Sequence, residues 1–207
     1  ALDRAGLADI VATCERLGIV LISDEIYHGL DYRAPSISAL ELTKNAIIIN
    51  SFSKYYCMTG WRIGWMVLPE HLVRRAEILQ QNLFISAPTL SQIAATAALG
   101  ERDYAEEQKA GYAANRLALD AGLRDLGFDV GDASDGAFYA YVGISKFSND
   151  SMAFCEKMLE QAGVAMTPGI DFDPDGGHRW VRLSYAGATD DVAEAMERLV
   201  QWCDAER

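Results

Sequence analysis

The chain has 207 residues, half of them hydrophobic, and 30 acidic against 18 basic side chains give it a formal net charge of −12. Such an acidic surface repels nucleic acid and anionic membranes, so we expect neither as a partner. The apolar runs at residues 19–22 and 46–49 are far shorter than the ~20 residues of a membrane-spanning helix.

The cysteines and histidines show no pattern typical of a disulfide framework or a metal site. Cys14, Cys57, Cys155 and Cys203 are widely separated, and the three histidines are isolated. We therefore expect reduced thiols, no metal ion and a cytoplasmic location. Residues 1–4 also lack the basic and hydrophobic regions that are typical of a signal peptide.

The beginning of the chain alternates helical and strand patterns. Apolar residues at helical spacing over 7–17, followed by Gly18, predict an amphipathic helix with a glycine cap. The short runs 19–22 and 46–49 predict two strands that are buried on both faces. A connecting segment with a short helix near 38–43 lies between them, so we expect the two strands to be parallel.

The later elements follow from the same patterns. A third strand over 61–68 is expected to run antiparallel to the second, because only a loop connects them. Helices are predicted at 72–83, 90–97, 104–126, 154–162 and from Thr189 onward. Further strands are predicted at 128–130, 137–142, 164–166 and 180–185.

Chemically active side chains gather where the two predicted parallel strands end. Asp24 follows the first strand, Ser51 and Lys54 follow the second, and Arg62 lies on the returning strand. Ligands of open α/β sheets collect at the carboxyl ends of the strands, so Lys54 is either a surface ion-pair partner or a chemical tool. A carboxylate, an amine, a hydroxyl and a guanidinium together suit a ligand with an anionic group and an electrophilic carbonyl.

Several longer motifs carry a family resemblance. "SDEIYHGL" (23–30) followed by "SFSKYYCMTGWRIGW" (51–65) resembles the pyridoxal-phosphate-dependent aminotransferases of class I and II, the fold-type-I group. The stretches "DGAFYAY" (135–141), "TPGIDF" (167–172) and "RWVRLSYA" (179–186) look like small-domain signatures of the same family. The most specific part is the core S-x-S-K-x-x-x-M-T-G-W-R.

The resemblance implies an α/β fold in two domains. Residues 1–90 would be the C-terminal part of the large cofactor-binding domain, a mostly parallel sheet with one antiparallel strand. Residues 91–127 would be connecting helices, and residues 128–207 would form a small C-terminal α/β domain. Family members are nearly twice as long and carry N-terminal motifs that this sequence lacks, so it resembles the C-terminal part of an aminotransferase. We expect this part alone to be inactive.

The resemblance also implies roles at the cofactor, pyridoxal 5'-phosphate. Lys54 would form the imine (Schiff base) with the cofactor aldehyde and then move a proton between the substrate α-carbon and the cofactor. Asp24 would pair with the pyridine nitrogen and keep it protonated, which makes the ring a better electron sink. Tyr27 would donate a hydrogen bond to the phenolic oxygen of the ring.

The remaining implied roles are in binding. Ser51 and Arg62 would hold the cofactor phosphate, and Arg182 would receive the substrate α-carboxylate, because the planar guanidinium fork meets such oxygens in pairs. The substrates would be an amino acid and a 2-oxo acid, and the family analogy implies a homodimer.

Each residue by itself also has a plainer interpretation. Tyr27 is expected to pack over the sheet, Glu25 to be solvated, and Arg182 to be an exposed structural arginine in an alternating strand. His28 has no assigned role. Only the joint spacing of Asp24, Tyr27, Ser51, Lys54 and Arg62 favours the catalytic interpretation over these plainer ones.

Two other functions remain open from the sequence. The first is a carbon–sulfur lyase or a decarboxylase on the same fold, although the M-T-G-W run after Lys54 favours an aminotransferase. The second is an aminotransferase-like sensor domain of a transcription regulator, which would have a DNA-binding module upstream. The sequence does not identify the amino donor.

Overall fold

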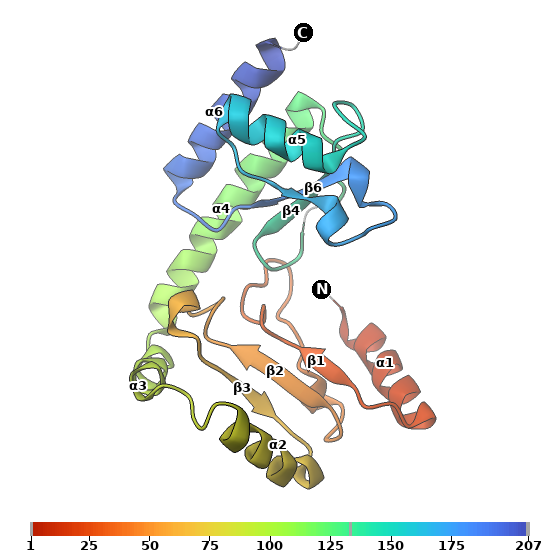
Figure 1. Cartoon of the computed structure of the whole chain (residues 1–207), viewed down its shortest axis with the longest axis vertical. Coiled ribbons are helices and arrows are strands. Elements are labelled where there is room, and N and C mark those ends of the chain that lie inside the picture. Colours follow the sequence, from red (N-terminus) through yellow and green to blue (C-terminus); the bar gives the residue numbers. More distant parts are fainter. Residues whose placement is uncertain (1, 133, 206–207) are drawn as a thin grey trace. The chain divides into compact units, whose positions relative to one another are not determined.

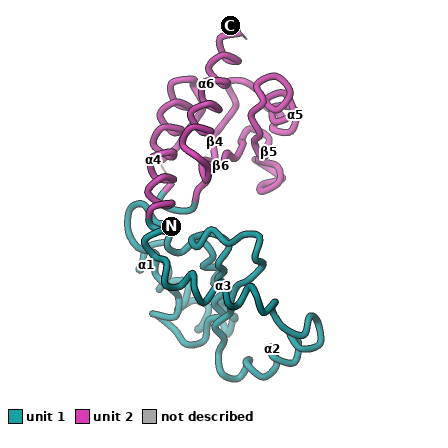
Figure 2. The backbone as a smooth tube through the Cα atoms, turned by 90° about the vertical axis from the view of Figure 1, so that its left-hand side faces the viewer, with its two compact units in different colours: residues 1–106, 135–137 teal, residues 107–134, 138–207 magenta. Residues whose placement is uncertain are grey.

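The computed structural model describes residues 2–132 and 134–205. They form two compact units, drawn in different colours in Figure 2. Unit 1 comprises residues 1–106 and 135–137, and unit 2 comprises residues 107–134 and 138–207. The boundary after residue 106 falls within the long helix α4, Arg102–Leu126. The three-part domain division expected from the sequence stays a prediction.

Unit 1 is built on a three-stranded sheet in the order β1-β2-β3 (Figure 1). The strands are β1 (Ile22–Asp24), β2 (Ile47–Ser51) and β3 (Gly64–Val67). The β1 and β2 strands are parallel and β3 is antiparallel to β2, as the sequence predicts. The carboxyl ends of β1 and β2 therefore lie at the same edge of the sheet.

The helices of unit 1 begin and end near the predicted residues. They are α1 (Arg4–Leu17), α2 (Glu70–Leu83) and α3 (Thr89–Ala98), with short 3-10 helices η1 (Ala39–Glu41) and η2 (Thr59–Trp61). Asp3 caps α1 by accepting a hydrogen bond from the Gly6 amide, and Gly18 ends the helix with a left-handed φ of 66°. Leu7 of α1 shares a buried cluster with Ala39 of η1 and Ile48 of β2, which holds the crossover against the sheet.

The predicted burial of the first strand is wrong. The strand begins three residues later than expected, at Ile22, and the side chains of Ile19, Val20 and Ile22 are 55%, 60% and 59% exposed. The reason is that β1 is an edge strand, with β2 as its only strand neighbour among the described residues. Burial on both faces requires neighbours that the described part of unit 1 does not supply.

Unit 2 contains an antiparallel sheet in the order β4-β6-β5. The strands are β4 (Tyr139–Gly143), β5 (Thr167–Pro168) and β6 (Trp180–Ser184). Around them lie α5 (Ser151–Lys157), which continues as a π-helical turn η3 (Met158–Ala162), and α6 (Thr189–Ala205), with 3-10 turns η4 (Gly169–Asp171) and η5 (Gly177–Arg179).

Two strands predicted in unit 2 differ from what forms. Residues 128–130 make only an isolated bridge, Asp129 to Gly143, and the strand expected at 164–166 forms at 167–168. Both segments directly follow the glycines Gly127 and Gly163, which end helices with a positive φ. The first amide of each segment still donates to a carbonyl of the preceding helix, so it is not available for strand pairing. The apolar runs therefore pack as core without extended pairing.

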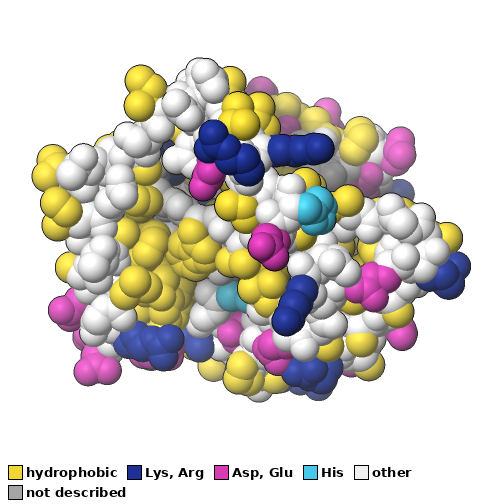
Figure 3. All heavy atoms as spheres, turned by 90° about the horizontal axis from the view of Figure 1, so that it is seen from below, with side chains coloured by type: hydrophobic (Ala, Val, Ile, Leu, Met, Phe, Trp, Pro, Cys, Tyr) yellow, Lys and Arg dark blue, Asp and Glu magenta, His cyan; other side chains and the backbone are white. Residues whose placement is uncertain are grey.

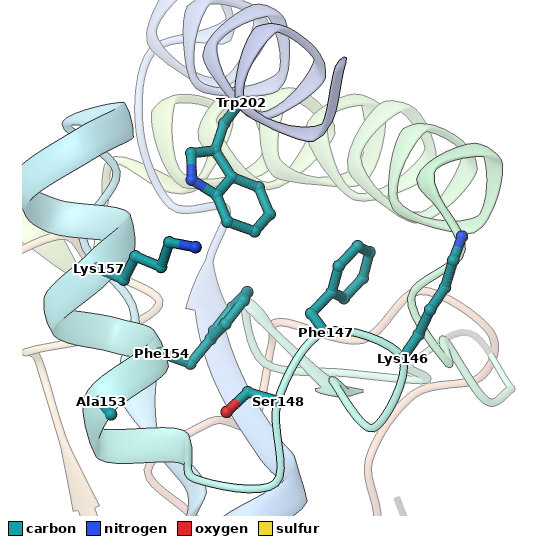
Figure 4. Close-up of a pocket in the computed structure, with 7 residues that line it drawn as sticks. All are labelled: Lys146, Phe147, Ser148, Ala153, Phe154, Lys157 and Trp202. Carbon is teal, nitrogen blue, oxygen red and sulfur yellow. The ribbon is translucent and has the colours of Figure 1, made fainter. Parts of the chain in front are cut away.

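The core of unit 2 includes a cluster of aromatic rings. Phe147, Phe154 and Trp202 lie with ring centroids 5.9–6.1 Å apart. Beside them is a pocket of about 300 Å³, which Lys146 and Lys157 also line (Figure 4). The Lys146 ammonium donates to the Leu126 carbonyl at the end of α4. The same three rings line this pocket, and Phe154 and Trp202 are only 3% and 8% exposed, so we assign these two to the core of unit 2.

No helix formed by the described residues is long and apolar enough to cross a lipid bilayer.

Candidate active site

Asp24 is the last residue of β1 and lies beside Ile49 of β2 in the parallel register. Its carboxylate is exposed, and one oxygen accepts a hydrogen bond from the Ile26 amide at 3.2 Å. This local turn begins where the strand ends, while the Glu25 amide still donates to the Ile49 carbonyl of β2 at 2.8 Å. The carboxylate therefore stands at the carboxyl edge of the sheet, where ligands of open sheets bind.

Lys54 lies in a tight turn that follows β2. The Ser53 amide donates to the Ser51 hydroxyl oxygen at 3.0 Å, and the Cys57 amide donates to the Lys54 carbonyl at 3.0 Å. Phe52 and Met58 of the same turn pack on Ala95 of α3, so the turn has a solid support. These contacts fix the backbone from which the half-buried Lys54 side chain extends.

The structure brings Lys54 and Tyr27 together. The Lys54 ammonium lies over the Tyr27 ring, 5.4 Å from its centroid. Tyr27 comes from the turn after β1 and Lys54 from the turn after β2, so this cation–π contact joins the two strand ends. The plainer expectation for Tyr27, packing over the sheet, does not include this contact.

Ser51 is the last residue of β2, whereas Arg62 directly follows η2 and precedes β3, so the prediction that Arg62 lies on the returning strand is wrong. The Ser51 hydroxyl donates to the Ile63 carbonyl at 3.0 Å. The hydroxyl oxygens of Ser51 and Ser53 lie 2.9 Å apart. Arg62 has a left-handed backbone with φ of 50°, and its exposed guanidinium donates to the Thr59 carbonyl at 3.0 Å. Hydroxyls and a guanidinium on neighbouring turns are donors suited to a phosphate.

Close packing opposite Ser51 depends on a glycine. Ser51 pairs with Gly64 across the β2–β3 register. A Cβ atom on Gly64 would lie 2.6 Å from the Asn50 carbonyl oxygen, which is too close for any other residue. The glycine thus allows the backbone approach that brings Arg62 and Ser51 onto adjacent turns.

Glu25 is a supporting residue that the sequence interpretation missed. The expectation that it is solvated is wrong, because the residue is only 4% exposed. One carboxylate oxygen accepts from the Ser23 and Ser38 hydroxyls, both at 3.1 Å, and from the Ala39 amide at 2.9 Å. The other oxygen lies 3.3 Å from Nδ1 of His28. Asp24 and Tyr27 lie on the turn that contains Glu25. Through its contacts with Ser38 and Ala39, Glu25 therefore attaches this turn to the crossover segment.

Only part of this arrangement had a signal in the sequence. The spacing of Glu25 and His28 predicts that the two side chains can meet within one turn. The hydroxyl of Ser38 comes from a loop 13 residues away, and no local pattern indicates that it would reach the same carboxylate.

Tyr55, next to Lys54, provides a second support. Its ring packs on Gly29, whose φ is 95° and whose Cβ position lies 2.6 Å from the ring. Its hydroxyl donates to the Glu106 carboxylate at 2.6 Å, and burial together with this acidic partner raises the pKa of Tyr55 to about 12. The turn that carries Lys54 is thus tied to the loop after Tyr27.

Arg182 belongs to unit 2 and lies on β6. The alternation expected there is present, since Val181 and Leu183 are buried on one face and Arg182 is half-buried on the other. Its guanidinium carbon lies 4.2 Å from the centroid of the Tyr139 ring and 4.3 Å from that of Phe172. Arg182 is therefore not the simple exposed arginine of the plainer interpretation.

The fold and the residues at the strand ends define a protein class. A family model described as "Aminotransferase class I and II" matches residues 1–199, so the chain belongs to this family. The family resemblance drawn from the motifs is confirmed.

Individual relatives agree with this assignment. The chain is 48% identical over 200 residues to a valine–pyruvate aminotransferase of Mycobacterium tuberculosis, covering 95% of this chain and 52% of that protein. It is 40% identical to a (5-formylfuran-3-yl)methyl phosphate transaminase of Methanocaldococcus jannaschii, covering 88% of this chain and 49% of that protein.

A solved structure shows the same fold. The crystal structure of a putative aminotransferase from Silicibacter pomeroyi matches with a TM-score of 0.94 at 47% identity, covering 99% of this chain and 55% of that one. The expected fold-type-I α/β architecture is thus confirmed. The chain spans about half the length of the relatives that it matches.

Proposed function

We propose that this protein is a pyridoxal 5'-phosphate-dependent aminotransferase that transfers an amino group between an amino acid and a 2-oxo acid. The observation that carries the proposal is the Lys54 ammonium over the Tyr27 ring at 5.4 Å, at the sheet edge where β1 ends in Asp24. An amine, a phenol and a carboxylate from adjacent strand ends, in a chain of this family, fit the cofactor's aldehyde, phenolic oxygen and ring nitrogen.

The residues of unit 1 have distinct tasks in this proposal. Lys54 would hold the cofactor covalently through its aldehyde (a Schiff base) and carry a proton to and from the substrate α-carbon. Asp24 would keep the ring nitrogen protonated by its negative charge, and Tyr27 would orient the ring by a hydrogen bond. When bound, the cofactor supplies an electron-accepting ring that stabilises negative charge at the substrate α-carbon.

The remaining residues would bind and orient. The Ser51 hydroxyl and the exposed Arg62 guanidinium supply donors for the cofactor phosphate, and both would have to exchange a present carbonyl partner for it. Arg182 would bind the substrate α-carboxylate with its planar fork. Holding the two reactants in this way lowers the entropic part of the barrier.

A homodimer is the proposed assembly. Unit 1 exposes large hydrophobic side chains on α2, α3 and the loop between them, including Leu83 at 73%, Ile85 at 80% and Leu90 at 74%. Figure 3 shows hydrophobic side chains gathered on one face of the molecule. Surfaces of this kind are typical of interaction sites, and a second copy is the partner that the family analogy favours. The cytoplasmic location stays a prediction, supported by the scattered positions of the four cysteines in the sequence.

The first experiment is a half-reaction of the full-length natural protein with the cofactor and no acceptor, because we expect the 207-residue part alone to be inactive. Addition of an amino acid is expected to convert the bound cofactor to its amine form, which is seen as a shift of the visible absorption band. Valine is the donor to test first, and pyruvate is the acceptor to add afterwards for the return half-reaction, because a relative with 48% identity is named for this pair. A carbon–sulfur lyase or a decarboxylase would release product without this conversion, and a sensor domain would bind without turnover.

The second experiment compares two lysine substitutions. Lys54→Ala is expected to remove both the visible band and the activity, because no other amine stands at this edge in the proposal. Lys44→Ala, at an exposed position before β2, is the matched control and is expected to retain both. Full activity in Lys54→Ala would overturn the proposed function.

A further inference from the structure

Two aromatic rings that come from different elements lie against the Arg182 guanidinium. Tyr139 is on β4, the strand next to β6, and Phe172 directly follows the turn η4. Both ring centroids lie close to the guanidinium carbon, at 4.2 Å and 4.3 Å. Because the guanidinium lies over both rings at contact distance and a planar cation has only two faces, we infer that the two rings cover these two faces.

The position of Phe172 is fixed by its backbone and by a neighbouring ring. The Phe172 amide donates to the Gly169 carbonyl at 3.0 Å, and a Cβ atom on Gly169 would lie 2.4 Å from the Gly177 carbonyl oxygen. The loop that carries Phe172 is thus too tightly packed to shift freely. Tyr141, which lies opposite Arg182 in the β4–β6 register, meets the Phe172 ring edge-on at 6.4 Å.

Tyr141 is itself held in place. Its ring stacks on Trp180 at 5.3 Å with an interplanar angle of only 6°. Tyr139, Tyr141, Trp180 and Phe172 therefore form a frame of rings along one face of the unit 2 sheet. Within this frame the guanidinium is expected to lose much of the rotational freedom of an arginine side chain.

Stacking restricts how an anion can approach the guanidinium. The N–H bonds of a guanidinium lie in its plane, so a group whose two faces are covered binds through its edge. A carboxylate is planar and matches that edge with two parallel hydrogen bonds. A tetrahedral phosphonate has a third oxygen outside the plane, which would meet a ring face.

We propose that Tyr139 and Phe172 are positioning residues that make Arg182 selective for planar carboxylates over tetrahedral anions. The inference rests on the proposed function, in which Arg182 binds the substrate α-carboxylate. It adds that the rings, and not the arginine alone, set the chemical class of anion accepted. Neither ring needs to touch the reacting atoms.

The experiment measures KM, kcat and inhibition in the natural protein. Alanine serves as the carboxylate substrate and 1-aminoethylphosphonate as its tetrahedral competitor. Phe172→Leu removes one ring at a side chain that is already 49% exposed, so the variant is expected to fold. We expect KM for alanine to rise about 3- to 30-fold, the range of a lost cation–π contact, with a smaller change in kcat. The preference for alanine over the phosphonate should fall by a similar factor.

Conservative and distant substitutions separate a positioning role from a general structural one. Tyr139→Phe keeps the ring and is expected to match the wild type, whereas Tyr139→Leu should behave like Phe172→Leu. Tyr104→Leu, at a 54% exposed position on α4, is the control for loss of an aromatic ring elsewhere. Calorimetric binding of pyruvate provides a readout that does not depend on turnover.

The outcomes distinguish the role of Arg182 in the proposed function from the role of the two rings. If Arg182→Leu leaves the KM for alanine unchanged, the assignment of Arg182 in the proposed function is wrong. If Arg182→Leu raises KM but Phe172→Leu and Tyr139→Leu leave both KM and the carboxylate preference unchanged, the role of the rings is overturned and the proposed function stands.

Discussion

The two units differ in how completely they bury their own apolar residues. In unit 2, Val181 and Leu183 of β6 are 0% and 5% exposed, and Leu199 and Trp202 of α6 are 0% and 8% exposed. In unit 1, all four residues of β3 are exposed and α2 has no buried residue. Unit 2 therefore has a core of its own, whereas the described residues of unit 1 form small buried clusters, such as those around Ile48 and Phe52, and leave much apolar surface uncovered.

The difference bears on where the proposed chemistry lies. Lys54, Asp24, Tyr27, Ser51 and Arg62 all belong to unit 1, whose sheet has few strands and exposed apolar side chains. Their turns are held by local contacts such as those of Glu25 and Tyr55, but the sheet beneath them needs further cover. Arg182, by contrast, stands on a strand with a buried face.

The largest effect is expected when the two units are produced separately. Residues 107–207 should give a folded monomer, because their sheet and helices bury one another. Residues 1–106 should aggregate or form oligomers, because burying exposed side chains such as Leu83 and Ile85 is favourable at about 25 cal/mol per Å². Light scattering and circular dichroism measure both. A well-behaved monomer of residues 1–106 would contradict the comparison.

A matched pair of leucine substitutions tests the same contrast in the intact chain. Leu199→Ala, at a fully buried position in unit 2, is expected to lower the free energy of unfolding by about 2–5 kcal/mol through lost transfer and cavity terms. Leu83→Ala, at a position in unit 1 that is 73% exposed in the single chain, should change it by less than about 0.5 kcal/mol at protein concentrations where the chain is monomeric.

Denaturant unfolding measures both variants. A large loss in Leu83→Ala would show that α2 is covered in solution, for example by a second copy. The pair thus separates a surface that is exposed in solution from one that is buried only in an assembly.

Within unit 1, the most consequential single contact is the buried Glu25 carboxylate. Glu25→Ala leaves two serine hydroxyls and the Ala39 amide without their acceptor, which should cost about 1–3 kcal/mol of unfolding free energy. Activity should also fall, because the turn with Asp24 and Tyr27 loses its anchor. Unfolding curves and kcat measure the two effects.

The control substitutions separate the acceptor from the charge. Glu25→Gln keeps an oxygen for the three donors and should retain most of the stability. Glu41→Ala, which removes an exposed partner of Arg4, should have little effect. Equal losses in Glu25→Gln and Glu25→Ala would mean that the charge beside His28, and not the acceptor oxygen, is what matters.

The sequence was sufficient for features that depend on local pattern. The parallel β1–β2 pair, the antiparallel β3, the glycine cap of α1 and the long helix α4 all follow from periodicity, loop length and capping. The sequence also predicts that Asp24 and Lys54 follow strands whose carboxyl ends share an edge, and the parallel β1–β2 pair has this arrangement. The contact between Lys54 and Tyr27 was not part of that prediction.

Features that depend on distant neighbours were not predictable. The burial of residues 19–22 was wrong because an apolar run indicates where burial is favourable and not whether a neighbour supplies it. Glu25 was misjudged because its partner Ser38 comes from a separate loop. The rings around Arg182 are likewise brought together from β4 and from the segment after η4, which no spacing rule connects.

The smallest expected effect concerns Tyr55 and alkaline pH. The folded-state pKa of Tyr55 is raised from 10.0 to about 12, so the neutral phenol is favoured in the folded protein. A raised folded pKa gives stability that is fully present below pH 10 and is lost as the pH rises toward 12. Tyr55→Phe cannot ionise, so its unfolding free energy should decline less steeply over this window. Spectrophotometric titration should also lose one late-titrating tyrosine.

Tyr104→Phe, at an exposed tyrosine of the same unit, is the matched control and should keep the late-titrating phenol and the steeper decline. If both variants instead titrate alike, the hydroxyl of Tyr55 does not donate to Glu106 in solution, and the link between the Lys54 turn and α4 is absent. The support of the candidate site would then depend on Gly29 and α3 alone, which would widen the difference between the loosely held unit 1 and the self-contained unit 2.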